Sequence, residues 1–203
     1  MNITLFGGSF NPPTVGHQIV IAQAFELIPN IERLWLLPDY QHSFAKNETL
    51  APVADRLAMA QMLISKKVKL ETGCIDKKMS GNTIEHIAYL KTKYNRHRFS
   101  FLMGSDNLRT FTRWPEWQNL LHLMTFYIYP RAGFPLEPLY TNMMTLSHPQ
   151  QIITNISSTL VRERIKQNLD WGQLVPPAVA EYIRQKPLFL TDAYTSNTAV
   201  TAV

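Results

Sequence analysis

Two short segments near opposite ends of the chain combine residue types that bind phosphate. The first, residues 7–17, reads Gly-Gly-Ser-Phe-Asn-Pro-Pro-Thr-Val-Gly-His. Adjacent glycines let a backbone approach a bulky anion without a Cβ in the way. A helix that begins near Gly16 and His17 would direct unpaired N–H groups and a partial positive charge at the same point. The segment therefore predicts a phosphate-sized loop; the alternative is a tight turn with a histidine facing solvent.

The second segment, residues 156–162, reads Ile-Ser-Ser-Thr-Leu-Val-Arg. Ser157 or Ser158 can cap a helix that begins here, and Arg162 follows one turn later on nearly the same face as Ser158 or Thr159. Hydroxyls, unpaired N–H groups and a guanidinium would then converge on one anion. The alternative is an ordinary capped helix with a surface arginine.

Neither segment matches the dinucleotide or P-loop fingerprints, since the chain has no G-x-G-x-x-G and no G-x-x-x-x-G-K-[ST]. The Thr-x-Gly-His at residues 14–17 resembles the T/HxGH signature of the nucleotidyltransferase superfamily. Together with the ISSTxxR pattern of residues 156–162, it resembles the nicotinate/nicotinamide mononucleotide adenylyltransferase family. Further segments similar to that family are residues 54–59 (its RLxM helix), 80–83 (its SxxT turn), 101–108 with Trp114 and Trp117 (its GxDxL…W..W segment) and 176–189 (its closing helix).

The resemblance, which covers roughly residues 3–189, implies that the substrate ATP lies with its phosphates over both segments. The implied phosphate-binding residues are Gly8, Ser9, Phe10, Thr14, Gly16, His17, Ile156, Ser157, Thr159 and Arg162. Gly104 and Asp106 would take the adenosine end, where an aspartate can accept both ribose hydroxyls. Asp106 could instead cap a helix in the Gly-Ser-Asp turn.

The acceptor, nicotinate or nicotinamide mononucleotide, is implied to bind beside the ATP. Trp114 would stack on the pyridine ring next to Phe10 and Thr83, and Lys46 would meet the acceptor phosphate. Because it precedes Pro115, Trp114 could equally be a core aromatic at a helix start. We assign Trp117 to packing.

The implied reaction transfers AMP from ATP to the acceptor and releases pyrophosphate. His17, Arg162 and Lys46 are the candidate catalytic residues, because two repelling anions must be aligned and their charge neutralised. Mg²⁺ is expected as the cofactor, bridging phosphates with few or no protein ligands.

Three departures from the family pattern leave the acceptor open. Asn11 and Thr14 stand where many bacterial members have Asp and His, and His42 lies where many carry a Pro-Pro-His-Lys run. The preference between nicotinate and nicotinamide is therefore undetermined. Two alternatives also remain: another transferase of the superfamily, of phosphopantetheine or cytidylyl type, and a non-catalytic nucleotide-binding module.

Alternating apolar runs and amphipathic patterns indicate the elements that must position these residues. We expect strands at 2–6, 31–37, 68–71, 98–103, 124–129 and 151–154, and helices at 17–28, 53–65 and 83–93, the last capped by Asn82. Such alternation predicts a Rossmann-like, doubly wound α/β fold of the nucleotidyltransferase type, with a mainly parallel sheet and helices on both faces. In that fold the ligand binds at the carboxyl ends of the strands.

We expect one domain over residues 1–190, with C-terminal helices from residue 157. Residues 131–150 hold Gly133 and three prolines with little periodicity, which predicts a long loop or lid. Residues 191–203 are rich in Thr, Ala, Ser and Asn and are expected to be an exposed, poorly ordered tail.

Composition favours a globular protein of the cytoplasm. Hydrophobic residues make up 45% of the 203 residues and charged residues 17%, and the one cysteine, Cys74, cannot form an internal disulfide. We expect no signal peptide and no membrane span. The net charge of +5 suits an anionic ligand, and lysines and arginines at 91–98 fit a solvated helix end better than a nucleic-acid patch. A homo-oligomer is compatible with the sequence, which does not determine the oligomeric state.

Overall fold

The protein is described from a computed structural model, which covers residues 1–40 and 50–191. Its strands are β1 (Asn2–Gly8), β2 (Arg33–Pro38), β3 (Val68–Leu70), β4 (Arg98–Gly104), β5 (Phe126–Tyr129) and β6 (Met143–Thr145). Its helices are α1 (Val15–Leu27), α2 (Val53–Gln61), α3 (Gly73–Asp76), α4 (Thr83–Lys93), η2 (Ser105–Arg113), α5 (Trp117–Leu123), α6 (Ser158–Lys166), η3 (Gly172–Leu174) and α7 (Pro177–Arg184). His42 and Lys46 lie outside the described residues, as does nearly all of the predicted tail.

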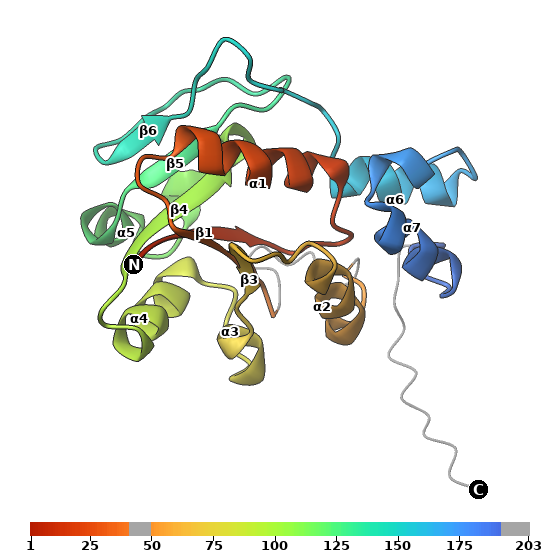
Figure 1. The fold of residues 1–203 in the computed structure, drawn as a ribbon, viewed down its shortest axis with the longest axis horizontal. Helices are drawn as coiled ribbons and strands as arrows, with labels where there is room; N and C mark the ends of the chain where they lie inside the picture. The colour runs from red at the N-terminus through yellow and green to blue at the C-terminus, as the bar shows by residue number, and fades with distance from the viewer. Residues whose placement is uncertain (41–49, 192–203) are drawn as a thin grey trace, which may run out of the picture.

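The six strands form one sheet in the order β3-β2-β1-β4-β5-β6, and every neighbouring pair is parallel. The chain starts in the middle and reverses its strand order beside β1, which creates the switch point where α/β sheets bind ligands. Helix α1 covers one face, and α3 and α4 cover the other (Figure 1). The predicted doubly wound fold is confirmed.

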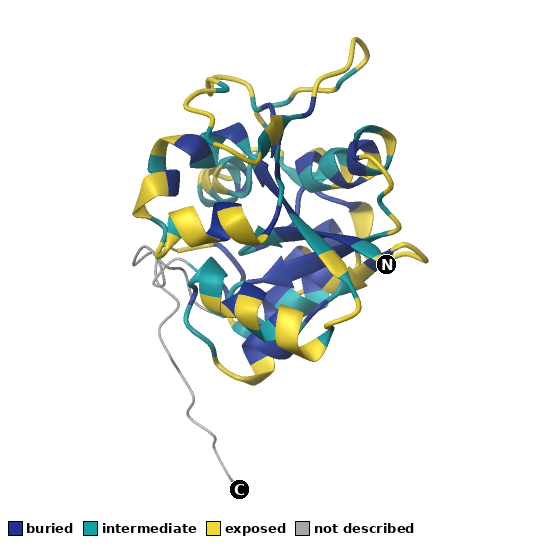
Figure 2. Ribbon diagram, turned by 90° about the vertical axis from the view of Figure 1, so that its left-hand side faces the viewer, coloured by how far each residue is buried: buried dark blue, intermediate teal, exposed yellow. Residues whose placement is uncertain are grey.

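Two apolar clusters fill the space between sheet and helices. One contains Trp35, Leu37 and Phe101 with Ile87 of α4, and its face of the sheet is here called the α4 face. The other contains Phe10 and Leu36 with residues of α1 and α2, and its face is called the α1 face. Buried residues of both clusters follow the sheet through the middle of the molecule (Figure 2). Side chains that alternate along one strand therefore enter different layers.

A third cluster joins the C-terminal helices to α2. Met59 of α2 packs with Val161 of α6 and with Val179 and Ile183 of α7. Tyr182 and Lys186 also bond the Asp55 carboxylate at 2.7 and 2.5 Å. The predicted helices after residue 157 are therefore attached beside the carboxyl end of the sheet, where α6 and α7 lie in Figure 1.

The sixth strand was predicted in the wrong place. Residues 151–154 form no strand, and β6 lies instead within 131–150, the segment predicted to be a loop. Ile152 and Ile153 are β-branched but about half exposed, and Ile152 is held by side chains, with its N–H donating to Gln23 (2.9 Å) and its carbonyl accepting from Tyr129 (2.7 Å). The position of the sixth strand is set by its pairing with β5 and not by local composition.

Helix boundaries differ from the expected ones by a few residues. Helix α1 begins at Val15 because Thr14 is its N-cap, and α2 ends at Gln61, ahead of the turn into β3. Asn82 does precede α4, but its side chain bonds Glu85 (3.1 Å) rather than a backbone N–H. Within the described ranges, no helix is long and apolar enough to cross a bilayer.

Candidate active site

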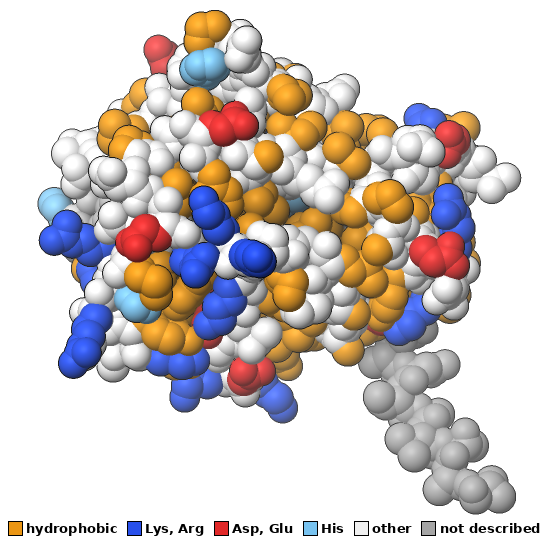
Figure 3. All heavy atoms as spheres, viewed as in Figure 1, with side chains coloured by type: hydrophobic (Ala, Val, Ile, Leu, Met, Phe, Trp, Pro, Cys, Tyr) orange, Lys and Arg blue, Asp and Glu red, His pale blue; other side chains and the backbone are white. Residues whose placement is uncertain are grey.

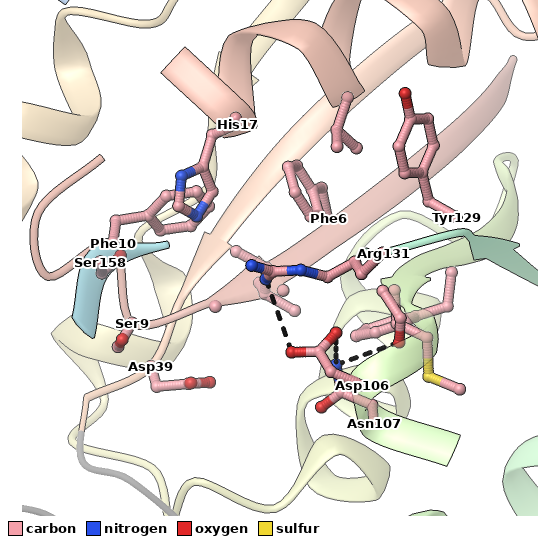
Figure 4. Close-up of a pocket in the computed structure, with 18 of the residues that line it drawn as sticks. Phe6, Ser9, Phe10, His17, Asp39, Asp106, Asn107, Tyr129, Arg131 and Ser158 are labelled. Atoms are coloured by element: carbon pink, nitrogen blue, oxygen red, sulfur yellow. Dashed lines mark hydrogen bonds and ion pairs between the residues drawn. The ribbon is translucent and has the colours of Figure 1, made fainter. Parts of the chain in front are cut away.

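A cavity of about 680 Å³ opens at the carboxyl ends of β1, β2, β4 and β5. It lies at the switch in strand order, and side chains from these elements converge on it (Figure 4). In the space-filling view the surface is hollowed between the sheet and the C-terminal helices (Figure 3). The predicted site residues that line it are Gly8, Ser9, Phe10, Thr14, Gly16, His17, Thr83, Gly104, Asp106, Trp114 and Ile156.

The loop after β1, residues 9–14, is held from outside by side chains of α2 and α6. The buried Arg56 donates to Ser9 O (3.0 Å), Arg162 to Asn11 O (2.8 Å) and Ser158 to Pro12 O (2.7 Å). Because these carbonyls are already bonded to protein donors, the loop keeps one backbone conformation. The loop can then present its N–H groups to an anion.

His17 lies at the first turn of α1 with its ring between those of Phe6 and Phe10, at centroid distances of 5.8 and 5.3 Å. The Thr14 backbone N–H donates to Nδ1 (3.0 Å). A backbone N–H can only donate, so the neutral ring carries its proton on Nε2. Burial, with a smaller effect of the Arg131 charge, lowers the pKa of His17 to about 4. At neutral pH the ring is thus an uncharged donor toward the cavity.

Arg131, which follows β5, is a cation of the cavity wall that the sequence did not predict. Its guanidinium forms an ion pair with Asp106 (3.5 Å) and donates to Ile156 O (3.3 Å), and Figure 4 shows it reaching across the site. Its own N–H donates to Ser105 Oγ (3.0 Å). The one available signal was an arginine two residues after a predicted strand.

Asp106 lies inside η2, whose N-cap is Gly104, so it does not cap the helix as the alternative supposed. Asn107 Nδ2 donates to Asp106 (3.5 Å) and to Gly104 O (3.3 Å). A Cβ on Gly104 would stand 2.3 Å from the Asp106 carboxylate and 2.7 Å from the Arg131 side chain. A glycine is therefore required at position 104 for Asp106 and Arg131 to lie this close to the backbone.

Trp114 packs against the core on one side and lines the cavity on the other. Its ring lies 6.1 Å from Phe101 and 5.3 Å from Phe111, centroid to centroid. It ends η2 and does not start α5, which begins at Trp117. Trp117 packs on Phe111 and Tyr140, as the packing assignment expects.

Of the residues expected from the second phosphate segment, Ile156 alone lines the cavity, where Ser158 joins it. Ser157 caps α6, accepting from Leu160 N–H (3.1 Å), which confirms the predicted cap. Ser158 and Ile156 line the cavity, whereas Ser157, Thr159 and Arg162 do not. Arg162 binds the first loop through Asn11 O and bonds the Thr159 hydroxyl (3.3 Å). The two segments do meet, because α6 turns these side chains toward the loop.

Asp39, directly after β2, is a second lining residue that the sequence did not single out. Burial raises the pKa of its carboxyl to about 7, against an opposing effect of the Arg56 charge. Together with Asp106 of η2, it gives the cavity wall formed by the described residues two carboxylates, which follow the different strands β2 and β4. In the described ranges no group of three or more His, Cys, Asp or Glu side chains could hold a metal ion.

Comparison with known proteins identifies the family of the chain. A family model described as cytidylyltransferase-like matches residues 5–164. The chain is 32% identical over 190 residues to the probable nicotinate-nucleotide adenylyltransferase of Flavobacterium johnsoniae, covering 90% of this chain and 96% of that protein. It is 30% identical to the protein of the same description from Myxococcus xanthus, covering 93% and 95%.

Solved structures show the same fold. The nicotinic acid mononucleotide adenylyltransferase of Plasmodium falciparum, complexed with NaAD, superposes with a TM-score of 0.79 at 21% identity, covering 93% of this chain and 97% of that one. The same enzyme complexed with APC gives 0.77 at 22% identity, covering 93% and 96%. The family model and the curated relatives show that the chain belongs to the nicotinate/nicotinamide mononucleotide adenylyltransferase family, within the nucleotidyltransferases of NAD biosynthesis.

Proposed function

We propose that this adenylyltransferase moves AMP from ATP to the 5′-phosphate of nicotinate or nicotinamide mononucleotide. A phosphate oxygen of the acceptor attacks the α-phosphorus in line, the bond from that phosphorus to the pyrophosphate oxygen breaks, and pyrophosphate leaves with the electron pair. The observation that carries the proposal is the neutral His17, which directs an Nε2–H donor into a cavity between the first loop and Ser158.

The ATP phosphates are proposed to lie over the first loop and the start of α1. Gly8, Ser9 and Gly16 allow the close approach, and the N-terminus of α1 attracts negative charge. His17 donates to an α-phosphate oxygen as charge shifts in the transition state. Because Nε2 carries the proton of the neutral ring, His17 can donate without first gaining a proton.

Arg131 and Asp106 are proposed to divide the nucleoside end between them. Asp106 accepts from the ribose hydroxyls, and the Arg131 guanidinium, already on the cavity wall, supplies positive charge on the ATP side. Arg162 is proposed to hold the first loop in position by donating to Asn11 O. Substitutions of Arg162 are therefore expected to change the conformation of that loop.

The acceptor is proposed to lie on the α4 face, between Trp114 and Thr83, with Phe10 near the junction of the two substrates. Trp114 offers an aromatic face for the pyridine ring, and its other side is supported by Phe101 and Phe111. Lys46 is proposed as the anchor of the acceptor phosphate on the resemblance alone, as it falls outside the described residues.

Mg²⁺ is proposed to enter with ATP. The described wall offers Asp39 and Asp106 from separate strands and no carboxylate cage, which fits an ion held mainly by phosphate oxygens and water. When bound, such an ion neutralises charge on the triphosphate and on the departing pyrophosphate. The cytoplasm is the proposed compartment, in keeping with a buried, free Cys74.

The test is pyrophosphate release from ATP and Mg²⁺ with a panel of acceptors. Release with nicotinate or nicotinamide mononucleotide, and none with phosphopantetheine or with CTP-dependent acceptors, is the expected result. Release only with the other acceptors would assign a different reaction in the superfamily. ATP binding without turnover of any acceptor would favour a nucleotide-sensing module.

A further inference from the structure

We propose that Asp39 is a specificity-determining residue, whose carboxylate disfavours an acceptor nucleotide with a negatively charged ring substituent relative to one with an uncharged amide. This rests on the proposed function, since it concerns the same cavity. It deepens that function by naming a residue that selects between the two acceptors left open above.

The register of β2 places Asp39 on the α4 face. Side chains alternate along a strand, and Trp35 and Leu37 both belong to the cluster that contains Phe101 and Trp114. Asp39, two residues after Leu37, continues that row past the end of the strand and lines the cavity there. Its carboxylate therefore lies on the side of the sheet where Trp114 forms the wall, away from α1.

The backbone of Asp39 is held at both polar atoms. Its N–H donates to Gly8 O (3.2 Å), and its carbonyl accepts from Arg56 (2.8 Å). Arg56 is fully buried and also bonds the carbonyls of Ser9, Tyr40 and Ala51, so its donors are directed to backbone. The backbone that carries the carboxylate is therefore fixed at the end of β2.

The Asp39 carboxylate itself has no hydrogen-bond partner among the residues 1–40 and 50–191. Figure 4 shows it below Ser9, pointing into the cavity, with no dashed line to it. When it is ionised, a half-buried carboxylate without a donor from the described residues acts strongly on a neighbouring charge, because little water screens it. The raised pKa of this carboxyl, about 7, is what such surroundings produce.

Nicotinate and nicotinamide mononucleotides differ in one group at the ring. The nicotinate carboxylate would meet a like charge, whereas the nicotinamide –NH₂ can donate to a carboxylate. Arg113 and Arg131 also line the cavity, and their positive charges attract the nicotinate carboxylate that Asp39 would repel. The prediction therefore concerns the ratio between acceptors: removal of the Asp39 charge shifts it toward nicotinate.

The experiment compares kcat/KM for both acceptors in the wild-type protein and in Asp39→Asn, which keeps the shape and removes the charge. The ratio of nicotinate to nicotinamide is expected to rise about tenfold in the variant, the scale of one like-charge contact in a partly buried site. Asp76→Asn is the matched control, since Asp76 is exposed on α3 and outside the cavity lining. That control should leave the ratio unchanged.

A second measurement needs no variant. In the wild-type protein, the ratio of kcat/KM for nicotinate to that for nicotinamide mononucleotide should rise as pH falls through 7, because Asp39 becomes protonated. Both acceptors carry the same phosphate, so its titration affects both values of kcat/KM equally and does not change the ratio. The titratable groups facing Asp39 are Arg56 of α2 and Cys74 of α3, with Arg131 and Asp106 among the cavity walls. The same ratio should be flat with pH in Asp39→Asn.

An unchanged ratio in Asp39→Asn, with both acceptors turned over, would overturn the inference and leave the proposed function intact. A fall in the ratio would also overturn it, because the carboxyl would then be a donor to nicotinate. No turnover of either acceptor by the wild-type protein would instead refute the proposed function, and the inference with it.

Discussion

The α1 side and the α4 side of the cavity are built in different ways. On the α1 side, one continuous loop and one helix start are held by bonds from Arg56, Ser158 and Arg162 to backbone carbonyls. On the α4 side, Asp39, Thr83 and Trp114 come from three separate elements and lie on apolar packing. A phosphate is bound by backbone N–H dipoles held in fixed positions, whereas the pyridine ring of the acceptor stacks on a flat apolar surface. We therefore expect damage to the α1 side to affect chemistry and damage to the α4 side to affect acceptor choice and affinity.

The largest effect is expected from Arg56→Met. It leaves the carbonyls of Ser9, Asp39, Tyr40 and Ala51 without their buried donor, and should lower the free energy of unfolding by about 3 kcal/mol. Chemical denaturation measures this loss. Because the loop relaxes, kcat should fall as well.

The neighbouring Asp55→Asn is the control for Arg56, since it disturbs the bonds from α2 to Tyr182 and Lys186 but none to the loop. It should reduce stability with little change in kcat. If both variants lost kcat equally at a temperature where each is folded, the loop would not depend on Arg56 in particular.

His17→Ala tests the α1 side directly. Loss of a donor to the transition state should lower kcat by at least about a hundredfold and leave the fold intact. Steady-state kinetics with saturating acceptor measures it. His148→Ala, which removes an exposed histidine away from the cavity, should have wild-type kinetics. Near-wild-type turnover of His17→Ala would refute its catalytic role.

Trp114→Ala tests the α4 side. KM for the acceptor should rise about tenfold while KM for ATP stays constant, because a stacking surface is lost and the phosphate loop is untouched. Trp117→Ala is the matched control: Trp117 packs on Phe111 as Trp114 does but does not line the cavity. An unchanged acceptor KM in Trp114→Ala would assign Trp114 to the core alone.

The smallest effect concerns stability and pH at Asp39. Its folded-state pKa of about 7 lies above the ordinary value of 3.8, so the folded protein holds this proton more tightly than the unfolded chain. The contribution to stability is thus complete below pH 3.8 and is lost as pH rises to 7. Asp39→Asn should gain stability relative to wild type between pH 5 and pH 8. We expect about 1 kcal/mol, since the half-buried side chain is screened by solvent. A pH-independent difference in melting temperature would contradict this.

Contiguous features of the site could be predicted from the sequence. The loop at residues 7–17 and the cap at Ser157 depend on neighbours within a few positions, so residue type and spacing are enough to predict them. The alternation of apolar runs likewise predicted the parallel sheet, because each strand must be buried on both faces.

Three features depended on long-range contacts. Arg131 and Asp39 enter the cavity because β5 and β2 end beside β4 and β1, and no local pattern marks them. Arg162 was expected at the phosphate, and its bond to Asn11 O could not be predicted, since it depends on how α6 packs against α2. The sixth strand likewise depended on the edge offered by β5.

The amino-acid sequence by itself determined the class of fold and the chemistry of the first loop, because both arise from local periodicity and from backbone freedom at glycine. Only the tertiary structure decided which charged side chains line the cavity. Charge at a site depends on which strand ends and helices become neighbours, and that is set by packing of the whole core.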